Sequence, residues 1–317
     1  MDTRRPIGLS AVAMMVGVCA IWGFQQIALK HAAPDMTPML QIGLRSGAAA
    51  LLVAALMHWR GEPLLALADG SWRPGLVVGL LFGSEFLMIG EGLRHTTASH
   101  MVVFLYTAPI FAALGLHRRL PAERLAPLQW VGVGLAFGGI AIAFFGGSGG
   151  HAQHATGSSG TTLWGDLLAL LAGLTWGTTT VVVRCSRLAT IPASRTLLYQ
   201  LLGAFVLLLA AAFAFGQAGI RPSPMLWANL AFQTVVVAFA SYLLWFWMLR
   251  RYVASQLGVF SFMTPLFGVA FGVWLLNEPL EPGFVSGAVL VGLGIVLVSG
   301  HRLLQQGARS LMGSAPS

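Results

Sequence analysis

The stretches LRHTTASHMVVF, residues 93–104, and LRRYVASQLGVF, residues 249–260, share six of their twelve residues at a constant spacing of 156. The register continues past both stretches without a gap, because Pro109 aligns with Pro265 at the same spacing. The chain therefore carries one segment twice, about half its length apart. This repetition predicts two homologous halves.

A second pair of stretches supports the repeat. IWGFQQIALK at residues 21–30 and TWGTTTVVVR at residues 175–184 align at a spacing of 154. Each contains Trp-Gly, with a cation eight residues after the tryptophan. The agreement of two independent pairs makes a chance match a poor explanation.

The chain is far more apolar than a soluble protein. Hydrophobic residues make up 56% of its 317 residues, charged residues 9%, and the mean hydropathy is +0.78. A soluble domain carries about 25% charged residues, and a membrane helix needs about 20 apolar residues. The composition therefore predicts an all-α integral membrane protein with ten transmembrane helices. They are expected at residues 9–29, 37–58, 74–93, 97–116, 126–145, 163–184, 193–215, 225–249, 253–276 and 282–300.

A Gly/Ser-rich stretch, GGSGGHAQHATGSSGTT at residues 146–162, divides the chain near its middle. Such a composition is typical of an external linker between two folded units. The five-helix repeats are accordingly expected at residues 9–145 and 163–300, and residues 301–317 are expected to form a cytoplasmic tail.

The basic residues are distributed unequally between alternate loops. If the N-terminus is cytoplasmic, fourteen Arg residues fall on the inner side, and Lys30, Arg94 and Arg221 fall on the outer side. The positive-inside rule predicts this bias, and with it a multi-pass protein of the cytoplasmic (inner) membrane with both termini inside. It also accounts for the net charge of +8 without a nucleic-acid partner.

The second half begins after five helices, an odd number, so the two halves are expected to be inverted relative to each other in the bilayer. Inverted repeats are the plan of many secondary transporters, in which the solute site lies near the bilayer midplane between the repeats. The repetition therefore favours a carrier that moves a solute by alternating access.

Three motifs carry a resemblance to a known family: WGFQQIALK at residues 22–30, ASHMVVFLYTAPIFAALG at residues 98–115 and LLNEPLEP at residues 275–282. With them the chain resembles the EamA-type transporters of the drug/metabolite transporter superfamily over nearly its whole length. The resemblance implies a monomeric or weakly associating exporter or exchanger of small metabolites. It also implies a central cavity lined by the first four helices of the first half and their counterparts. Glu85 and Glu91 depart from the family's pattern, because the third helix of many relatives is more uniformly apolar.

Two charged residues are expected deep in the membrane. Arg45 and Glu85 lie about eight residues from the outer ends of their adjacent helices, which is about 12 Å of helix. An isolated charge at the bilayer centre costs about 3 kcal/mol or more. We therefore expect either an Arg45–Glu85 ion pair or two groups that share one cavity. The pair would serve helix packing, whereas a cavity site would serve solute binding or proton coupling. Glu91 lies nearer the outer rim, beside Lys30 and Arg94.

Pro109 and Pro265 fall near the middle of their helices and free the carbonyls of Leu105 and Ser261. They are candidates for gating kinks, although proline is also common as a simple kink in membrane helices.

Several aromatic and polar residues are also expected near the midplane. Trp22 and Trp176 lie there, whereas Trp59, Trp72, Trp245 and Trp247 are expected at the membrane interface. Polar groups within the bilayer should face the protein interior. The further candidates for the cavity wall are Gln25, Gln26, Tyr106, Thr179, Tyr199 and Tyr242.

The sequence thus favours export or exchange of a small organic metabolite, amino acid-like or drug-like, with protons as a candidate coupling ion. An intramembrane enzyme and a non-transporting membrane scaffold are the alternatives. No metal-ligand set or nucleophile–base pair is evident at membrane depth, so neither a metal nor a cofactor is expected.

Overall fold

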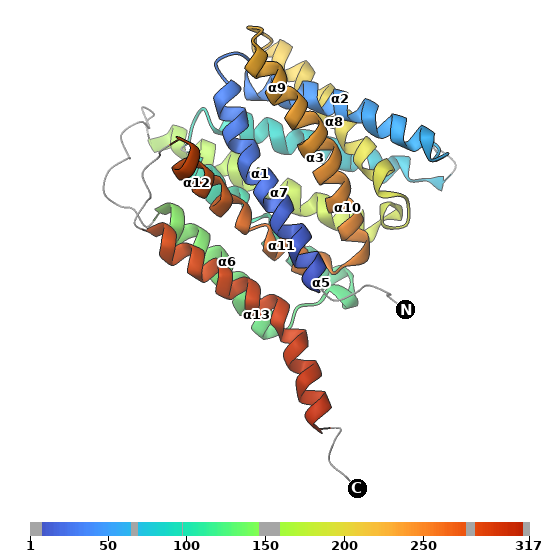
Figure 1. Ribbon diagram of the computed structural model, residues 1–317, viewed down its shortest axis with the longest axis vertical. Coiled ribbons are helices and arrows are strands. Elements are labelled where there is room, and N and C mark those ends of the chain that lie inside the picture. The colour runs from blue at the N-terminus through green and yellow to red at the C-terminus, as the bar shows by residue number, and fades with distance from the viewer. Residues whose placement is uncertain (1–7, 65–68, 97, 146–158, 277–282, 313–317) are drawn as a thin grey trace.

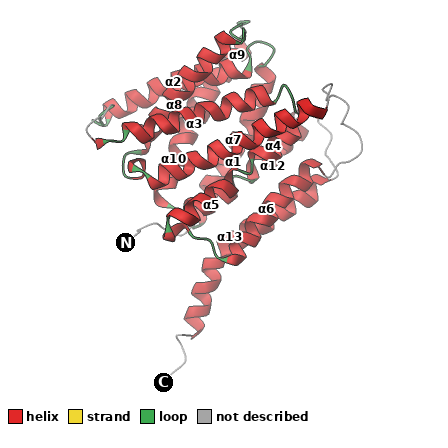
Figure 2. Ribbon diagram, turned by 180° about the vertical axis from the view of Figure 1, so that it is seen from behind, coloured by secondary structure: helices red, strands yellow, loops and turns green. Residues whose placement is uncertain are grey.

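The structure is a computed structural model that describes residues 8–64, 69–96, 98–145, 159–276 and 283–312 (Figure 1). Within these ranges the regular elements are all helices (Figure 2), and one isolated β-bridge joins Met36 to Ile220. The first half contains α1 (Leu9–Ala32), α2 (Pro38–Trp59), α3 (Trp72–Gly92), α4 (Ala98–Leu105), α5 (Ala108–Arg119), η2 (Pro121–Glu123) and α6 (Pro127–Phe145). The second contains α7 (Ser159–Cys185), η4 (Arg187–Ala189), α8 (Ala193–Ala214), α9 (Pro224–Phe232), η5 (Gln233–Ser241), α10 (Tyr242–Arg251), α11 (Ala254–Phe260), α12 (Met263–Leu276) and α13 (Gly283–Met312).

Eight helical segments in the described ranges are long and apolar enough to cross a membrane. They are Leu9–Ala32, Pro38–Trp59, Trp72–Gly92, Met101–Arg119, Leu163–Cys185, Ala193–Ala214, Pro224–Arg251 and Ala254–Leu275. The apolar parts of α6 and α13, Pro127–Ala143 and Gly283–Val298, are shorter. The chain is therefore a multi-pass membrane protein, and the expected number of ten transmembrane helices stays a prediction.

The expected boundary at residue 301 does not end a helix. α13 continues to Met312, into the segment expected as a tail. Residues 301–312 contain good helix formers and no proline, which accounts for the continuation of the helix. The stretch at residues 277–282 and the linker at residues 146–158 lie outside the described residues.

Two helices begin with a side-chain cap followed by proline. Thr37 precedes Pro38, and its hydroxyl accepts a hydrogen bond from the Leu40 amide at the start of α2. Ser223 precedes Pro224 and caps α9 in the same way. A capping hydroxyl satisfies an amide that has no partner in the helix, and proline at the first helical position is preset for helical φ.

Both proline-containing segments are broken just before the proline. α4 ends at Leu105 and α5 begins at Ala108, ahead of Pro109. α11 ends at Phe260 and α12 begins at Met263, ahead of Pro265. Proline removes a backbone donor and crowds the preceding turn, so two corresponding discontinuities arise, one in each half.

The two halves are interleaved in space. Each helix of the first half packs on helices of the second. α1 packs on α12, and α2 packs on η5. α3 packs on both α7 and α8, and α4 and α5 pack on α7. α2 packs on α8, and α6 lies along α13 at the edge of the bundle (Figure 1). Gly132 lies against Gly294 and Gly139 against Gly287, so residue numbers rise along α6 as they fall along α13. These two helices are therefore antiparallel.

The surface of the bundle is apolar where helices face outward. Large side chains such as Leu51, Val206 and Phe213 are 64–73% exposed. Polar side chains such as Gln41 and Asn229, which are joined by a hydrogen bond of 2.8 Å, are buried between helices. This pattern suits a lipid solvent, in which polar groups find partners only inside the protein.

The loops gather at two ends of the bundle. One, which we call the basic end, contains the start of α1, the end of α13 and the loops at residues 60–64, 117–126 and 186–192 (Figure 1). The opposite end contains residues 33–37 and 216–223, where the Arg221 amide donates to the Asp35 carbonyl.

Candidate functional site

A cavity of about 770 Å³ lies between the halves, among α1, α3, α7 and α10. Its described lining residues include Trp22 and Trp176, six other aromatic residues and one carboxylate. They are Trp22, Gln25, Gln26, Phe82, Glu85, Phe86, Ile89, Leu105, Tyr106, Trp176, Thr179, Thr180, Val183, Gln200, Tyr242, Trp245, Phe246, Leu249 and Thr264.

Each of the four principal helices lines the cavity with one stripe. α3 contributes Phe82, Glu85, Phe86 and Ile89, and α10 contributes Tyr242, Trp245, Phe246 and Leu249. α1 contributes Trp22, Gln25 and Gln26, and α7 contributes Trp176, Thr179, Thr180 and Val183. Residues three, four and seven positions apart share a helix face. The cavity is therefore built from regular helices.

Aromatic rings form much of the wall and hold one another edge to face. The Trp22 ring centroid lies 5.5 Å from that of Trp245 and 5.9 Å from that of Tyr242. Tyr106 meets Trp176 at 5.4 Å. The Trp22 indole Nε1 also donates to the Ser241 hydroxyl at 2.9 Å, and Ser241 ends the π-helix η5. Edge-to-face packing and this hydrogen bond hold the rings in place.

Glu85 projects into this aromatic wall. The residue is 7% exposed, and within the described part of the chain its Oε2 atom has no hydrogen-bond partner. An ionised carboxylate in such a place is costly unless a cation or a proton accompanies it. Glu85 is thus the one acidic group among the described residues that line the cavity.

The expected Arg45–Glu85 ion pair is wrong. Arg45 is 1% exposed, and its guanidinium donates to the Gln233 side-chain oxygen and, at 3.3 Å, to the Tyr242 hydroxyl. Its charge also lies 5.5 Å from the centre of the Phe86 ring. Arg45 is not among the described residues that line the cavity. Because α2 packs on η5, the guanidinium instead meets Gln233 and Tyr242 of the second half.

Two other expectations need correction. Tyr199 does not line the cavity: its ring covers Gly75, and its hydroxyl lies 3.3 Å from that of Ser71, near the basic end. Trp245 is a cavity residue instead of an interface residue, since it is 6% exposed and packs on Trp22. Trp59, by contrast, is 82% exposed.

The remaining candidates are placed as follows. Trp22, Gln25, Tyr106, Trp176, Thr179 and Tyr242 all line the cavity with Glu85. Pro109 lines a smaller adjoining pocket of about 260 Å³, between α5 and α11. Pro265 lines neither cavity among the described contacts.

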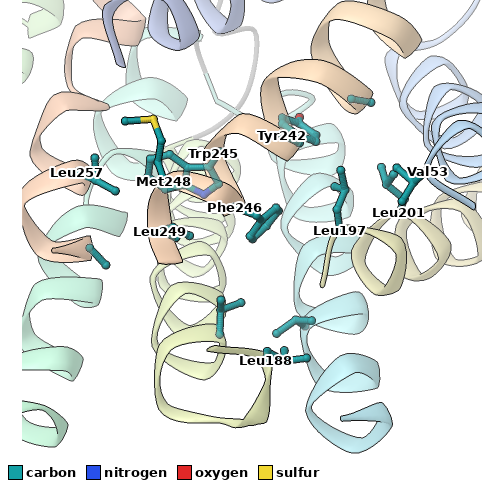
Figure 3. Packing of buried hydrophobic residues seen from close by; sticks show 14 of the residues in the cluster. Val53, Leu188, Leu197, Leu201, Tyr242, Trp245, Phe246, Met248, Leu249 and Leu257 are labelled. Atoms are coloured by element: carbon teal, nitrogen blue, oxygen red, sulfur yellow. The ribbon is translucent and has the colours of Figure 1, made fainter. Parts of the chain in front are cut away.

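Sequence reasoning missed Trp245, Phe246, Phe82 and Phe86. A signal was present for three of them, because Trp245 and Phe246 lie three and four residues from the recognised candidate Tyr242, and Phe82 lies three residues from Glu85. Side chains at this spacing lie on the same helix face. Figure 3 shows Tyr242, Trp245, Phe246 and Leu249 along α10.

A buried polar cluster lies next to the cavity, toward the basic end. The Arg184 guanidinium donates to the Glu123 carboxylate and to the Leu249 carbonyl. Glu123 in turn accepts from the amides of Ala254 and Ser255, at 3.2 and 3.1 Å. The cluster joins η2, α7, α10 and α11, and it includes the backbone carbonyl of the cavity residue Leu249.

A second contact ties the loops of this end together. Asp69 accepts a hydrogen bond from the Ser71 amide at 2.8 Å and one from Arg195 at 2.6 Å. Hydrogen bonds from Ser71, with the Arg195 charge, lower the pKa of the Asp69 carboxyl. The loop before α3 is thereby fastened to α8.

A bundle of apolar helices around a largely aromatic cavity with one carboxylate defines a multi-pass membrane protein with a site of solute size. A model of the EamA-like transporter family matches residues 9–145 and 163–300. The chain therefore belongs to the EamA-like transporter family, within the drug/metabolite transporter superfamily.

Relatives agree with this assignment. The uncharacterized transporter YoaV of Bacillus subtilis is 23% identical, over 89% of this chain and 94% of its own. The uncharacterized protein PA1977 of Pseudomonas aeruginosa is 30% identical, over 96% and 97%. The uncharacterized inner membrane transporter YedA of Escherichia coli is 25% identical, over 88% and 87%. A solved crystal structure with 19% identity superposes with a TM-score of 0.76 over 91% of this chain and 96% of its own, which shows a shared fold. The family and these names indicate a membrane transporter rather than an enzyme.

Proposed function

We propose that the protein is a secondary transporter that exports or exchanges a small organic metabolite, amino acid-like or drug-like, across the cytoplasmic membrane by alternating access. The observation that carries the proposal is the cavity lined by both halves, with corresponding residues Trp22 and Trp176 on its wall. Inverted-repeat carriers place their solute at this kind of interface.

The pattern of helix packing supports two inverted five-helix halves. In the repeat, α1 corresponds to α7, α2 to α8, α3 to the α9–η5–α10 segment, and α4–α5 to α11–α12. The contact of α1 with α12 therefore has its counterpart in the contact of α7 with α4 and α5. The contact of α3 with α8 has its counterpart in the contact of η5 with α2. The antiparallel glycine contacts of α6 and α13 obey the same exchange, since Gly132 corresponds to Gly287 and Gly139 to Gly294 at a spacing of 155. A two-fold axis in the membrane plane relates halves in this manner.

The buried cluster around Glu123 and Arg184 supports a carrier with one closed side. It joins segments of both halves and binds the backbone carbonyl of the cavity residue Leu249. For alternating access this cluster must open at the basic end while contacts at the opposite end close. We propose that the described conformation is closed on the cytoplasmic side.

Glu85 is the proposed coupling residue, through a proton or a cationic solute. Glu85 lines the cavity, and within the described part of the chain its buried Oε2 atom has no hydrogen-bond partner, so we propose that its protonation or ion pairing follows the occupancy of the cavity. Neither an intramembrane enzyme nor a scaffold requires this arrangement.

Flux through the purified protein tests the proposal. Proteoliposomes containing the full chain should show saturable, counterflow-stimulated movement of at least one solute from a panel of amino acids, amines and small metabolites. Protein-free liposomes and liposomes containing the Glu85→Gln variant are the controls. Absence of saturable flux across the panel, with correctly folded protein in the bilayer, contradicts the transport proposal.

A further inference from the structure

We infer that the solute of this cavity is an organic ammonium ion that keeps at least one N–H bond and carries an apolar body. The inference rests on the proposed function, because it names the class of solute that the carrier moves. Three features of the cavity wall carry it: its charge, its aromatic rings and its unpaired acceptors.

The charge of the wall is that of a cation site. Among the lining residues that the structure describes, Glu85 is the one acidic residue and none is basic. Arg45, the nearby cation, is separated from the cavity by Tyr242 and Phe86 and is occupied by Gln233 and Tyr242. A solute with its own carboxylate would therefore find no exposed counter-ion, whereas an ammonium ion finds Glu85.

The rings of the wall suit a cation with an apolar body. Eight of the described lining residues are aromatic, including three tryptophans, Trp22, Trp176 and Trp245. The faces and edges of these rings enclose apolar groups, and an aromatic face attracts a cation within about 6 Å of its centre. Tryptophan is the strongest partner of this kind.

The unpaired atoms indicate that the cation donates hydrogen bonds. In the described part of the chain, Glu85 Oε2 and Gln25 Oε1 are both buried acceptors without a partner, and both residues line the cavity. A buried acceptor left unpaired is unfavourable, and an N–H group satisfies it whereas a quaternary ammonium group does not. The arrangement therefore favours a primary, secondary or tertiary amine in its protonated form.

Binding to the purified full-length protein tests this without relying on flux. The probes are 2-phenylethylamine, its N,N,N-trimethyl derivative, the neutral 2-phenylethanol and the zwitterion phenylalanine, titrated by calorimetry in nanodiscs at neutral pH. We expect saturable binding of 2-phenylethylamine that is about 10- to 100-fold tighter than that of each other probe, the worth of one hydrogen bond to a charged group.

Two variants assign the binding to its residue. Glu85→Gln should weaken 2-phenylethylamine binding by about the same factor. Glu91→Gln is the matched control, because Glu91 lies six residues further along α3 and is occupied by Arg94 and His95 at 3.0 and 3.1 Å. It should bind the amine as the wild type does.

Each other result overturns the inference. Equal or tighter binding of phenylalanine, 2-phenylethanol or the trimethyl derivative contradicts the amine assignment, even if Glu85→Gln fails to fold. Undiminished amine binding in Glu85→Gln contradicts the role of the carboxylate. The outcome is separable from the proposed function: neutral or zwitterionic flux without amine binding refutes the inference alone, and amine binding without any flux refutes transport alone.

Discussion

Glu123 and Arg184 form an ion pair in which neither side chain reaches solvent, with side-chain exposures of 0% and 1%. The pair links the short helix η2 of the first half to the end of α7 in the second. Such a pair is strongly destabilised when one partner is removed, by about 3–5 kcal/mol, because the other charge stays buried. As the proposed closure of the basic end, the pair is expected to control access to the cavity from that side.

We expect Glu123→Gln to open the basic end. The measurement is the labelling rate of Leu249→Cys by a membrane-impermeant thiol reagent applied from the cytoplasmic side, in a Cys185→Ser background because Cys185 is exposed. Labelling should rise in Glu123→Gln and stay at its starting rate with Glu91→Gln. Unchanged labelling in a folded Glu123→Gln protein would show that the pair serves packing alone.

Pro109 and Pro265 are expected to control opposite states. Each stands just after a helix break, in corresponding places of the two halves. If the breaks are hinges, Pro109→Ala and Pro265→Ala should bias accessibility toward opposite sides of the membrane, measured by two-sided cysteine labelling of the cavity. Identical shifts from both substitutions would indicate ordinary kinks.

The structure changes what is expected of Glu85 and Arg45. Since Arg45 bonds to Gln233 and Tyr242, Glu85→Gln should abolish pH-dependent transport without lowering the thermal unfolding midpoint in detergent. Gln233→Leu should lower that midpoint, because a buried guanidinium loses a partner at a cost of about 1–3 kcal/mol. A destabilised Glu85→Gln protein that Arg45→Met restores would instead re-establish the Arg45–Glu85 pair.

Two glycines of α6 provide a matched test of the α6–α13 contact. A Cβ atom at Gly132 would lie 2.8 Å from the Gly294 carbonyl, whereas one at Gly134 would meet nothing within 4 Å. We expect Gly132→Ala to destabilise the protein by about 1–3 kcal/mol through overpacking. Gly134→Ala should be neutral or stabilise it by about 0.5–1 kcal/mol, because alanine favours a helix. Equal effects in thermal unfolding would contradict the close contact.

Both termini are expected in the cytoplasm. The basic residues divide fourteen to three between the two sides of the predicted topology, and the start of α1 and the end of α13 lie on the same side of the bundle (Figure 1). A reporter fused after residue 305 should be active only on the cytoplasmic side. An external C-terminus would refute this topology and, with it, the inverted arrangement.

The amino-acid sequence alone determined the class of the molecule and the depth of its candidate residues. Apolar runs of membrane length predicted the helices, and the repeated stretches at residues 93–104 and 249–260 predicted two halves. Counting residues from the helix ends brought Trp22, Trp176 and Glu85 to the middle of the bilayer, and the structure places all three around one cavity. Depth follows from rise per residue, which is nearly constant along a helix.

The tertiary structure decided which way each of these residues faces and what it meets. Arg45 and Glu85 were expected at one depth, yet Arg45 meets Gln233, which is 188 residues away along the chain, and Glu85 faces the cavity. Tyr199 turns to Gly75 on α3, and Trp245 turns inward to Trp22. The direction of a side chain around its helix depends on how that helix is rotated and which neighbours it packs against. Those neighbours belong to the other half of the chain, so only the assembled bundle determines them.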